Sequence, residues 1–222
     1  MTSTRDTART DPRVTRTRRL IEDAFLEVLQ EKGFEDLSVQ DVTERAGINR
    51  VTFYSHFVDR YALLRSSVRK AFEAEIEQRG LAERELRVAS VRDLFLAVCE
   101  YIDGMHQHCK PPHDHLDWIV GDVITDSSAE LFVRWSAARG KAAPRSFLES
   151  ATAAGSSLHA LAARRSRMKK RAAPGAFVES TLPIVTAILG LAEADSRRAQ
   201  PRLARSAANH RSSRSGFDVS RD

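Results

Sequence analysis

One stretch of the chain decides the fold: LSVQDVTERAGINRVTFYSHF, at residues 37–57. Ser38 precedes a short run with helical spacing, and Asp41 three positions later indicates a capping box at the start of a helix. Gly47 is expected to end that helix, because glycine readily adopts the left-handed conformation that closes a helix. Asn49 then caps a second short helix. Two short helices joined by a glycine-containing turn are typical of a helix-turn-helix.

The flanking sequence extends this unit to three helices. A preceding helix is predicted from about Thr15 to Glu31, because apolar residues recur three to four positions apart along one face. Those residues are Leu20, Ile21, Ala24, Phe25, Val28 and Leu29. Gly33 is expected to end this first helix. In the third helix, Phe53 and Phe57 are predicted to face the core, which leaves the other faces free.

Helical periodicity continues through the rest of the chain, so the sequence predicts an all-α protein of about nine helices. A three-helix head would be followed by a larger helical bundle. Beyond the head, the expected helices span residues 59–79, 90–108, 114–124, 127–138, 145–167 and 174–191. The expected domains are a flexible basic arm at 1–14, a helix-turn-helix domain at 15–58, a helical ligand-binding and dimerisation domain at 59–193, and a disordered basic tail at 194–222.

Composition and charge limit the class of protein. The chain has 222 residues, 29% of them charged, and no apolar run approaches the roughly 20 residues that cross a bilayer. A cytoplasmic location with no membrane contact is therefore expected, and no secretory leader is predicted. Residues 1–19 carry six arginines against two aspartates, and residues 194–222 carry seven against three. Basic ends suit contact with phosphates, although they also serve simply to keep a protein in solution.

Several short motifs in the head resemble the TetR family of transcriptional regulators. They include the hydroxyl residue Ser38 that opens the second helix, the turn Ala46-Gly47, and the run from Tyr54 to Phe57. Gly33-Phe34 and the closing run Phe57–Leu63 also match, and together the motifs cover about a quarter of the chain. The resemblance implies a DNA-binding head and a helical body that binds a ligand and dimerises.

The residues themselves indicate how this head would read DNA. Arg50 can form a bidentate contact with a guanine, and Val51 can meet a thymine methyl group. The resemblance implies phosphate contacts from Ser38, Thr52, Tyr54, His56 and Arg60, and base or groove contacts from Gln40, Asn49, Arg50, Val51 and Ser55. Two positions depart from the family pattern. Arg60 replaces the usual lysine, and Val51 stands where a small residue or proline is common.

The resemblance also implies how the body would work. The last two helices, at about residues 145–191, would pair with those of a second copy, and small residues at 151–157 would allow close approach. A ligand-responsive repressor is expected, which binds a near-palindromic operator of double-stranded DNA and is released by a small-molecule effector. No cofactor is expected. The candidate residues for the effector pocket are aromatic and aliphatic: Phe72, Phe95, Val98, Tyr101, Ile102, Met105, Trp118, Val123, Phe132 and Trp135.

Two other features leave alternatives open. Imidazole and thiolate groups bind zinc and copper well, and five of them lie within ten residues, at His106, His108, Cys109, His113 and His115. This cluster suggests a metal-sensing regulator or a metal-dependent enzyme, but its spacing matches no known zinc pattern. An enzyme is not expected, because the sequence contains no nucleophile elbow and no phosphate-binding glycine loop. The basic run at 164–171 is predicted to be a solvated loop, with a second nucleic-acid patch as the alternative.

Overall fold

The fold is built from α-helices. The computed structural model describes residues 11–108, 114–137 and 145–191, without the side chains of 106–108 and 114–116. Eight helices and no strand occur in these residues. They are α1 (Pro12–Lys32), α2 (Val39–Ala46), α3 (Arg50–His56), α4 (Arg60–Gln78), α5 (Val88–His108), α6 (Asp114–Ala137), α7 (Arg145–Ser166) and α8 (Pro174–Ile188). None of the described helices is long and apolar enough to cross a membrane.

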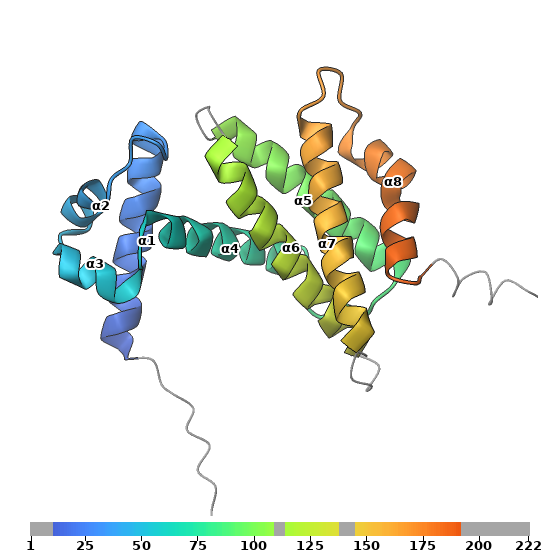
Figure 1. Cartoon of the computed structure of the whole chain (residues 1–222), viewed down its shortest axis with the longest axis horizontal. Helices are drawn as coiled ribbons and strands as arrows, with labels where there is room; N and C mark the ends of the chain where they lie inside the picture. The colour runs from blue at the N-terminus through green and yellow to red at the C-terminus, as the bar shows by residue number, and fades with distance from the viewer. Residues whose placement is uncertain (1–10, 109–113, 138–144, 192–222) are drawn as a thin grey trace, which may run out of the picture.

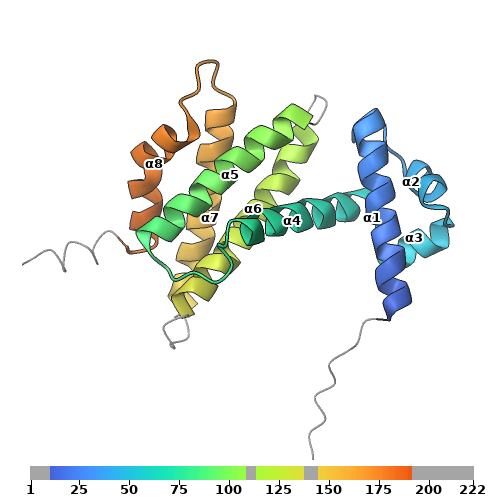
Figure 2. The same cartoon turned by 180° about the vertical axis from the view of Figure 1, so that it is seen from behind.

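The helices form a head and a body joined by one long helix. Helices α1 to α3 lie together at one end of the molecule, and α5 to α8 form a bundle at the other (Figure 1). Helix α4 begins beside α1 and extends into the bundle, as the reverse view also shows (Figure 2). Any movement of α4 relative to the bundle would therefore change the position of the head.

The local sequence of the head explains its three helices. Ser38 and Asp41 form the predicted capping box, in which the Ser38 amide donates to the Asp41 carboxylate at 2.9 Å. Gly47 ends α2 with a φ of 66°, in the left-handed region that favours glycine. Asn49 caps α3 by accepting the Thr52 amide at 2.8 Å. Phe53 of α3 is fully buried, and the apolar face of α1 completes the core of the head.

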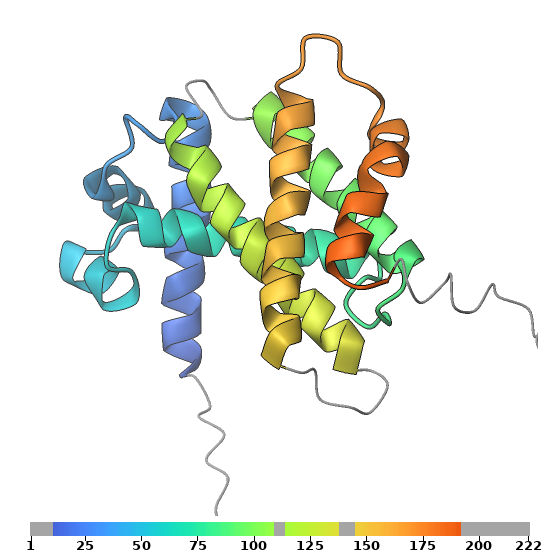
Figure 3. The same ribbon diagram turned by 45° about the vertical axis from the view of Figure 1, so that its right-hand side comes forward.

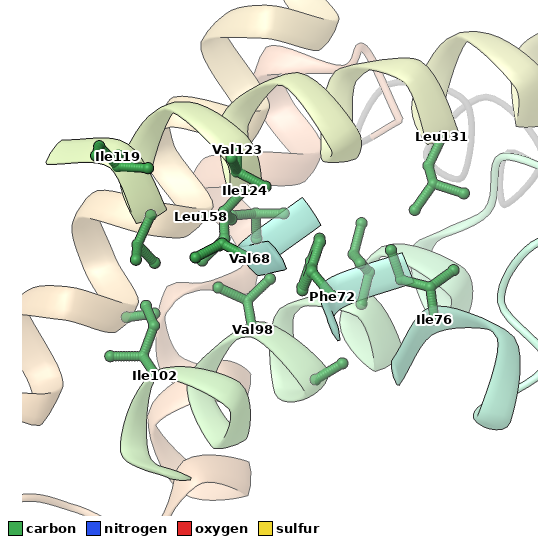
Figure 4. Close-up of a cluster of buried hydrophobic side chains, with 14 of the residues drawn as sticks. Val68, Phe72, Ile76, Val98, Ile102, Ile119, Val123, Ile124, Leu131 and Leu158 are labelled. Atoms are coloured by element: carbon green, nitrogen blue, oxygen red, sulfur yellow. The ribbon is translucent and has the colours of Figure 1, made fainter. Parts of the chain in front are cut away.

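The body is held together by a continuous hydrophobic core. Side chains from α4, α5, α6 and α7 meet in it, including Phe72, Val98, Ile124 and Leu158, each fully buried (Figure 4). Helix α7 lies between α6 and α8 in the turned view (Figure 3). Gly155 allows α7 to approach α6 closely, since a Cβ there would stand 2.6 Å from the carbonyl oxygen of Thr125.

Several boundaries differ from those predicted by the sequence. The predicted helices 114–124 and 127–138 are one helix, α6, so the described residues hold eight helices rather than nine. No glycine or proline interrupts residues 125–128, and Ser127 and Ser128 are buried in that helix. Helix α1 starts at Pro12 rather than Thr15, because the Asp11 side chain caps it by accepting the Arg13 amide at 2.8 Å. Residues 12–14 thus belong to the helix and not to an arm.

The basic run at 164–171 is also not a simple solvated loop. The side chain of Arg165 is buried and forms an ion pair with Asp103 of α5. Its Nη1 donates to the carbonyl oxygen of Ala172 at 3.0 Å, just before α8. Arg171 also reaches Asp103, at 3.3 Å. This charged cluster joins α5 and α7 to the loop before α8, so part of the basic run stabilises the body.

Candidate nucleic-acid interface

Helix α3 presents one face to solvent and the opposite face to the core of the head. Phe53 is buried, whereas Val51 is 79% exposed and Tyr54 is 54% exposed. Arg50 and Ser55 are also exposed. The Tyr54 ring stands edge-on to the Phe53 ring, with 5.4 Å between their centroids. Packing thus fixes the base of the Tyr54 side chain, and an exposed set of polar and apolar groups remains along the outer face.

Hydrogen bonds link α2 to α3 across this outer face. Arg50 donates to the Gln40 side chain at 2.8 Å, and Gln40 in turn donates to Glu44 at 2.7 Å. The Ser55 hydroxyl donates to the Thr52 carbonyl oxygen at 2.7 Å. Arg50 and Gln40, predicted to contact bases or the groove, therefore lie side by side in the free protein.

Two predicted contact residues are also helix caps. Asn49 accepts from both the amide and the hydroxyl of Thr52. Ser38 shares its capping box with Asp41, and Lys32 donates to that carboxylate at 2.6 Å. The Lys32 ammonium and the Ser38 amide and hydroxyl hold the pKa of Asp41 well below its usual range. The start of α2 is therefore fixed by a charge that persists at all physiological pH values.

Arg60 is directed towards the protein instead of towards the exposed face. Its Nη1 donates to the carbonyl oxygens of Phe34 and Leu37, at 3.0 and 2.6 Å. Its guanidinium carbon also lies 4.8 Å from the centre of the Phe34 ring. The residue predicted to contact a phosphate thus holds the loop between α1 and α2 against the start of α4.

A second contact between head and α4 was not predicted by the sequence. Glu22 of α1 is only 7% exposed, and its carboxylate accepts from Arg18 and, on α4, from Ser66 and Lys70. The Lys70 distance is 3.0 Å. The only indication in the sequence was a glutamate directly beside the apolar positions of α1. The same Arg18 lies over the Phe57 ring, 4.5 Å from its centroid.

Comparison with known proteins identifies this head. Residues 21–66 match the family model described as bacterial regulatory proteins, tetR family. The head is a TetR-family helix-turn-helix domain. A relative, the uncharacterized HTH-type transcriptional regulator YxbF of Bacillus subtilis, is 34% identical over 73 residues, or 32% of this chain. The match spans only 19% of the length of YxbF.

Solved structures resemble this chain only at low sequence identity. The fatty acid degradation regulator FadR from Bacillus halodurans is 14% identical, with 78% of this chain and 95% of FadR covered and a TM-score of 0.43. A TetR-family regulator from Mesorhizobium loti is 18% identical over 82% of this chain and 98% of its own, with a TM-score of 0.43. RolR, solved with resorcinol, is 16% identical over 86% and 97%, with a TM-score of 0.49. The family assignment therefore rests on the TetR-type head.

The ten residues predicted for an effector pocket do not share one environment. Seven are buried in the hydrophobic core: Phe72, Phe95, Val98, Ile102, Val123, Phe132 and Trp135. Tyr101 and Met105 are half-buried at its edge. Trp118 is 51% exposed, with the Arg65 guanidinium 5.6 Å from its ring. Trp135 also donates its indole N–H to the Leu81 carbonyl oxygen at 2.8 Å, which explains how it is buried without an unpaired donor.

The side chains of the predicted metal cluster, at His106, His108, Cys109, His113 and His115, lie outside the described residues. Among the side chains that the structure does describe, no three His, Cys, Asp or Glu residues gather in a way that could hold a metal ion. Cys99 is buried, and burial raises the pKa of its thiol to about 11. That thiol is therefore protonated at neutral pH and a poor nucleophile.

Proposed function

We propose that this protein is a transcriptional regulator that binds operator DNA with α3 in the major groove. The exposed face of α3 carries the argument, since it presents Arg50, Val51, Tyr54 and Ser55 outward while Phe53 anchors the helix from below. Arg50 and Val51 would read base edges, because a guanidinium fits guanine and a branched alkyl group fits the thymine methyl. Tyr54, Thr52 and His56 would fix the register on phosphates.

The positions of the caps and of Arg60 refine this assignment. Ser38 and Asn49 stand at the N-termini of α2 and α3, where backbone amides favour a phosphate. Gln40 would hold the Arg50 guanidinium in place for its base contact, through the 2.8 Å hydrogen bond. Arg60 would act indirectly, by fixing the loop before α2, because its Nη1 is already engaged by backbone carbonyls.

A dimer follows from the proposed mode of binding. Two recognition helices reach successive half-sites about 34–36 Å apart only when two heads are joined. The exposed apolar residues Leu148 of α7 and Ile184 of α8, 54% and 52% exposed, suit a contact between copies. Ala151, Ala154 and Gly155 are buried within one chain and serve the packing of α7 on its own body instead. Ile184→Arg should therefore yield monomers in sedimentation experiments, with the fold retained.

Regulation would act through α4. This helix joins the head to the bundle, so an effector bound in the body would change the spacing of the two heads by shifting α4. We infer a repressor in the cytoplasm, released from a near-palindromic operator when a small molecule binds. Binding, and not catalysis, is the function that these features support.

Selection of bound DNA from a random pool, followed by affinity measurements at several salt concentrations, tests the proposal. Tyr54→Phe should weaken binding of every sequence, whereas Arg50→Ala should also relax the preference at one base pair. Arg87→Ala, which removes the same charge from an exposed residue of the body that pairs with Glu85, is the matched control and should leave affinity unchanged. Unaltered operator binding by the Arg50→Ala, Tyr54→Ala double variant would show that α3 is not the reading helix.

A further inference from the structure

A hydrogen-bonded relay crosses the outer face of the head and consists of Glu44, Gln40 and Arg50. Glu44, in the last turn of α2, accepts from the Gln40 side-chain amide at 2.7 Å. Gln40 in turn accepts from the Arg50 guanidinium at 2.8 Å. Residues four positions apart share one face of a helix, so Glu44 and Gln40 are neighbours on α2. The relay thus passes from α2 to the first residue of α3, the helix packed beside it (Figure 1).

The two ends of the relay give it a single direction. A carboxylate can only accept hydrogen bonds, and a guanidinium can only donate them. The Gln40 amide stands between the two, so its nitrogen faces Glu44 and its oxygen faces Arg50. The reverse orientation would set oxygen against carboxylate and nitrogen against guanidinium, and both hydrogen bonds would be lost. Glu44 therefore holds Gln40 in the one orientation that can accept from Arg50.

This arrangement favours Arg50 over Gln40 as the residue that reads a base. A glutamine recognises adenine by offering its amide oxygen and nitrogen together. In this head the Gln40 oxygen is engaged by Arg50 and its nitrogen by Glu44. Arg50 gives only one of its N–H donors to Gln40, and the further donors of a guanidinium can still form a bidentate contact with a guanine.

We propose that Glu44 is a positioning residue that sets the base preference of the head by acting through Gln40 on Arg50. This role rests on the proposed binding of operator DNA by α3. An arginine side chain has many rotamers, and ordering it on binding costs free energy. In this head the Arg50 guanidinium is already held before DNA arrives, because Glu44 fixes Gln40 and Gln40 fixes Arg50.

The negative charge of Glu44 separates this role from a general electrostatic one. A carboxylate near DNA repels the phosphates, so removal of its charge alone should strengthen the binding of every sequence. Loss of the relay changes a different quantity, the preference for guanine at the base pair that Arg50 reads. Nor does α2 need this carboxylate for stability, because Glu44 is exposed and a negative charge in the last turn of a helix is unfavourable.

Affinities of the full chain for its selected DNA site and for single-base variants of that site test this role. Arg50→Ala identifies the base pair concerned. Glu44→Ala should reduce the preference at that base pair by about twofold to tenfold, the effect of ordering one long side chain on binding. Glu44→Gln keeps an oxygen that can accept from Gln40 and should restore the preference. Glu35→Ala, which removes the same charge from an exposed glutamate after α1, is the matched control and should leave the preference unchanged.

A double-mutant cycle shows whether Glu44 acts through Arg50. In the Arg50→Ala background, Glu44→Ala should change the base preference no further. Two results with DNA would overturn the proposal. One is a preference that Arg50→Ala relaxes and Glu44→Ala leaves intact. The other is an equal loss in Glu44→Ala and Glu44→Gln, which would assign the effect to the charge instead of the hydrogen bond.

NMR of the free protein tests the relay without DNA. Glu44→Ala should shift the side-chain amide resonances of Gln40 and increase the motion of the Arg50 Nε–H group, whereas Glu35→Ala should change neither. Unaltered Gln40 and Arg50 signals in Glu44→Ala would also overturn the proposal. The two possible failures are distinct. If no DNA is selected, the DNA-binding function fails and the role of Glu44 fails with it; if DNA is selected and only the Glu44 variants behave like the control, the role of Glu44 fails alone.

Discussion

Replacing Gly155 by alanine probes how tightly α6 and α7 are packed. An added Cβ would lie 2.6 Å from the Thr125 carbonyl oxygen and 3.4 Å from the Ser128 Cβ. The carbonyl belongs to the backbone of α6, so no change of rotamer relieves the contact. Helix α7 would have to move away from α6 along the most extensive helix–helix contact in the body.

The expected loss combines two opposing effects. Overpacking a well-packed core costs about 1–3 kcal/mol, and the upper end applies when backbone must move. Alanine in place of glycine within a helix gains about 1 kcal/mol. The net loss is therefore about 2 kcal/mol, which lowers the melting temperature of a chain of this size by about 4–8 °C.

Two other glycines serve as matched controls. A Cβ at Gly104 of α5 would meet nothing within 4 Å, so Gly104→Ala should keep the full helical gain. A Cβ at Gly121 would lie 2.6 Å from the His159 ring, which can move, so Gly121→Ala should fall between the other two. Urea and thermal unfolding at one fixed protein concentration measure all three. If Gly155→Ala proves as stable as Gly104→Ala, the close approach of α6 and α7 is wrong.

Three further changes test the body. Arg165→Ala should lower the free energy of unfolding in urea by about 3 kcal/mol, because Asp103 loses a buried partner. The control Arg167→Ala removes an exposed ion pair and should lower it by at most about 0.5 kcal/mol. Ser128→Ala should raise stability by about 1 kcal/mol, since its buried hydroxyl has no partner among the described residues; a loss would reveal a bond that the structure lacks. Burial lowers the pKa of His159 below 6.5, so the unfolded chain takes up a proton first on acidification. The free energy of unfolding should be highest above pH 6.5 and should fall as the pH drops towards the lower pKa of the folded state. His159→Gln should flatten that fall, and an unchanged profile would exclude His159 as its source.

The head could be predicted almost completely because its determinants are local. The capping pair Ser38 and Asp41, the glycine that ends α2, and the Asn49 cap each act within three or four residues of the helix end that they define. Such short-range rules are visible in a sequence without knowledge of the tertiary fold. The buried face of α1 was also identified, except that Leu20 is 45% exposed rather than inward.

What the sequence did not predict depends on contacts between distant residues. The continuity of α6 at Ser127 and Ser128 is maintained by burial against neighbouring helices, and serines inside a helix give little local indication of this. The buried Arg165 lies in a run of basic residues that reads as solvated, and only the position of Asp103 on α5 explains its burial.

The two charged contacts between the head and α4 give the departure at Arg60 a physical meaning. A lysine could reach one carbonyl of the loop before α2, but the planar guanidinium reaches several and also stacks on Phe34. Glu22 forms the other contact, with Ser66 and Lys70 of α4. The orientation of the head on α4 therefore depends on hydrogen bonds and ion pairs in addition to apolar packing. Because Glu22 is only 7% exposed and Arg60 bonds to backbone carbonyls, salt should screen these contacts little, so we expect the coupling between body and head to persist at ionic strengths that weaken the phosphate contacts made by α3.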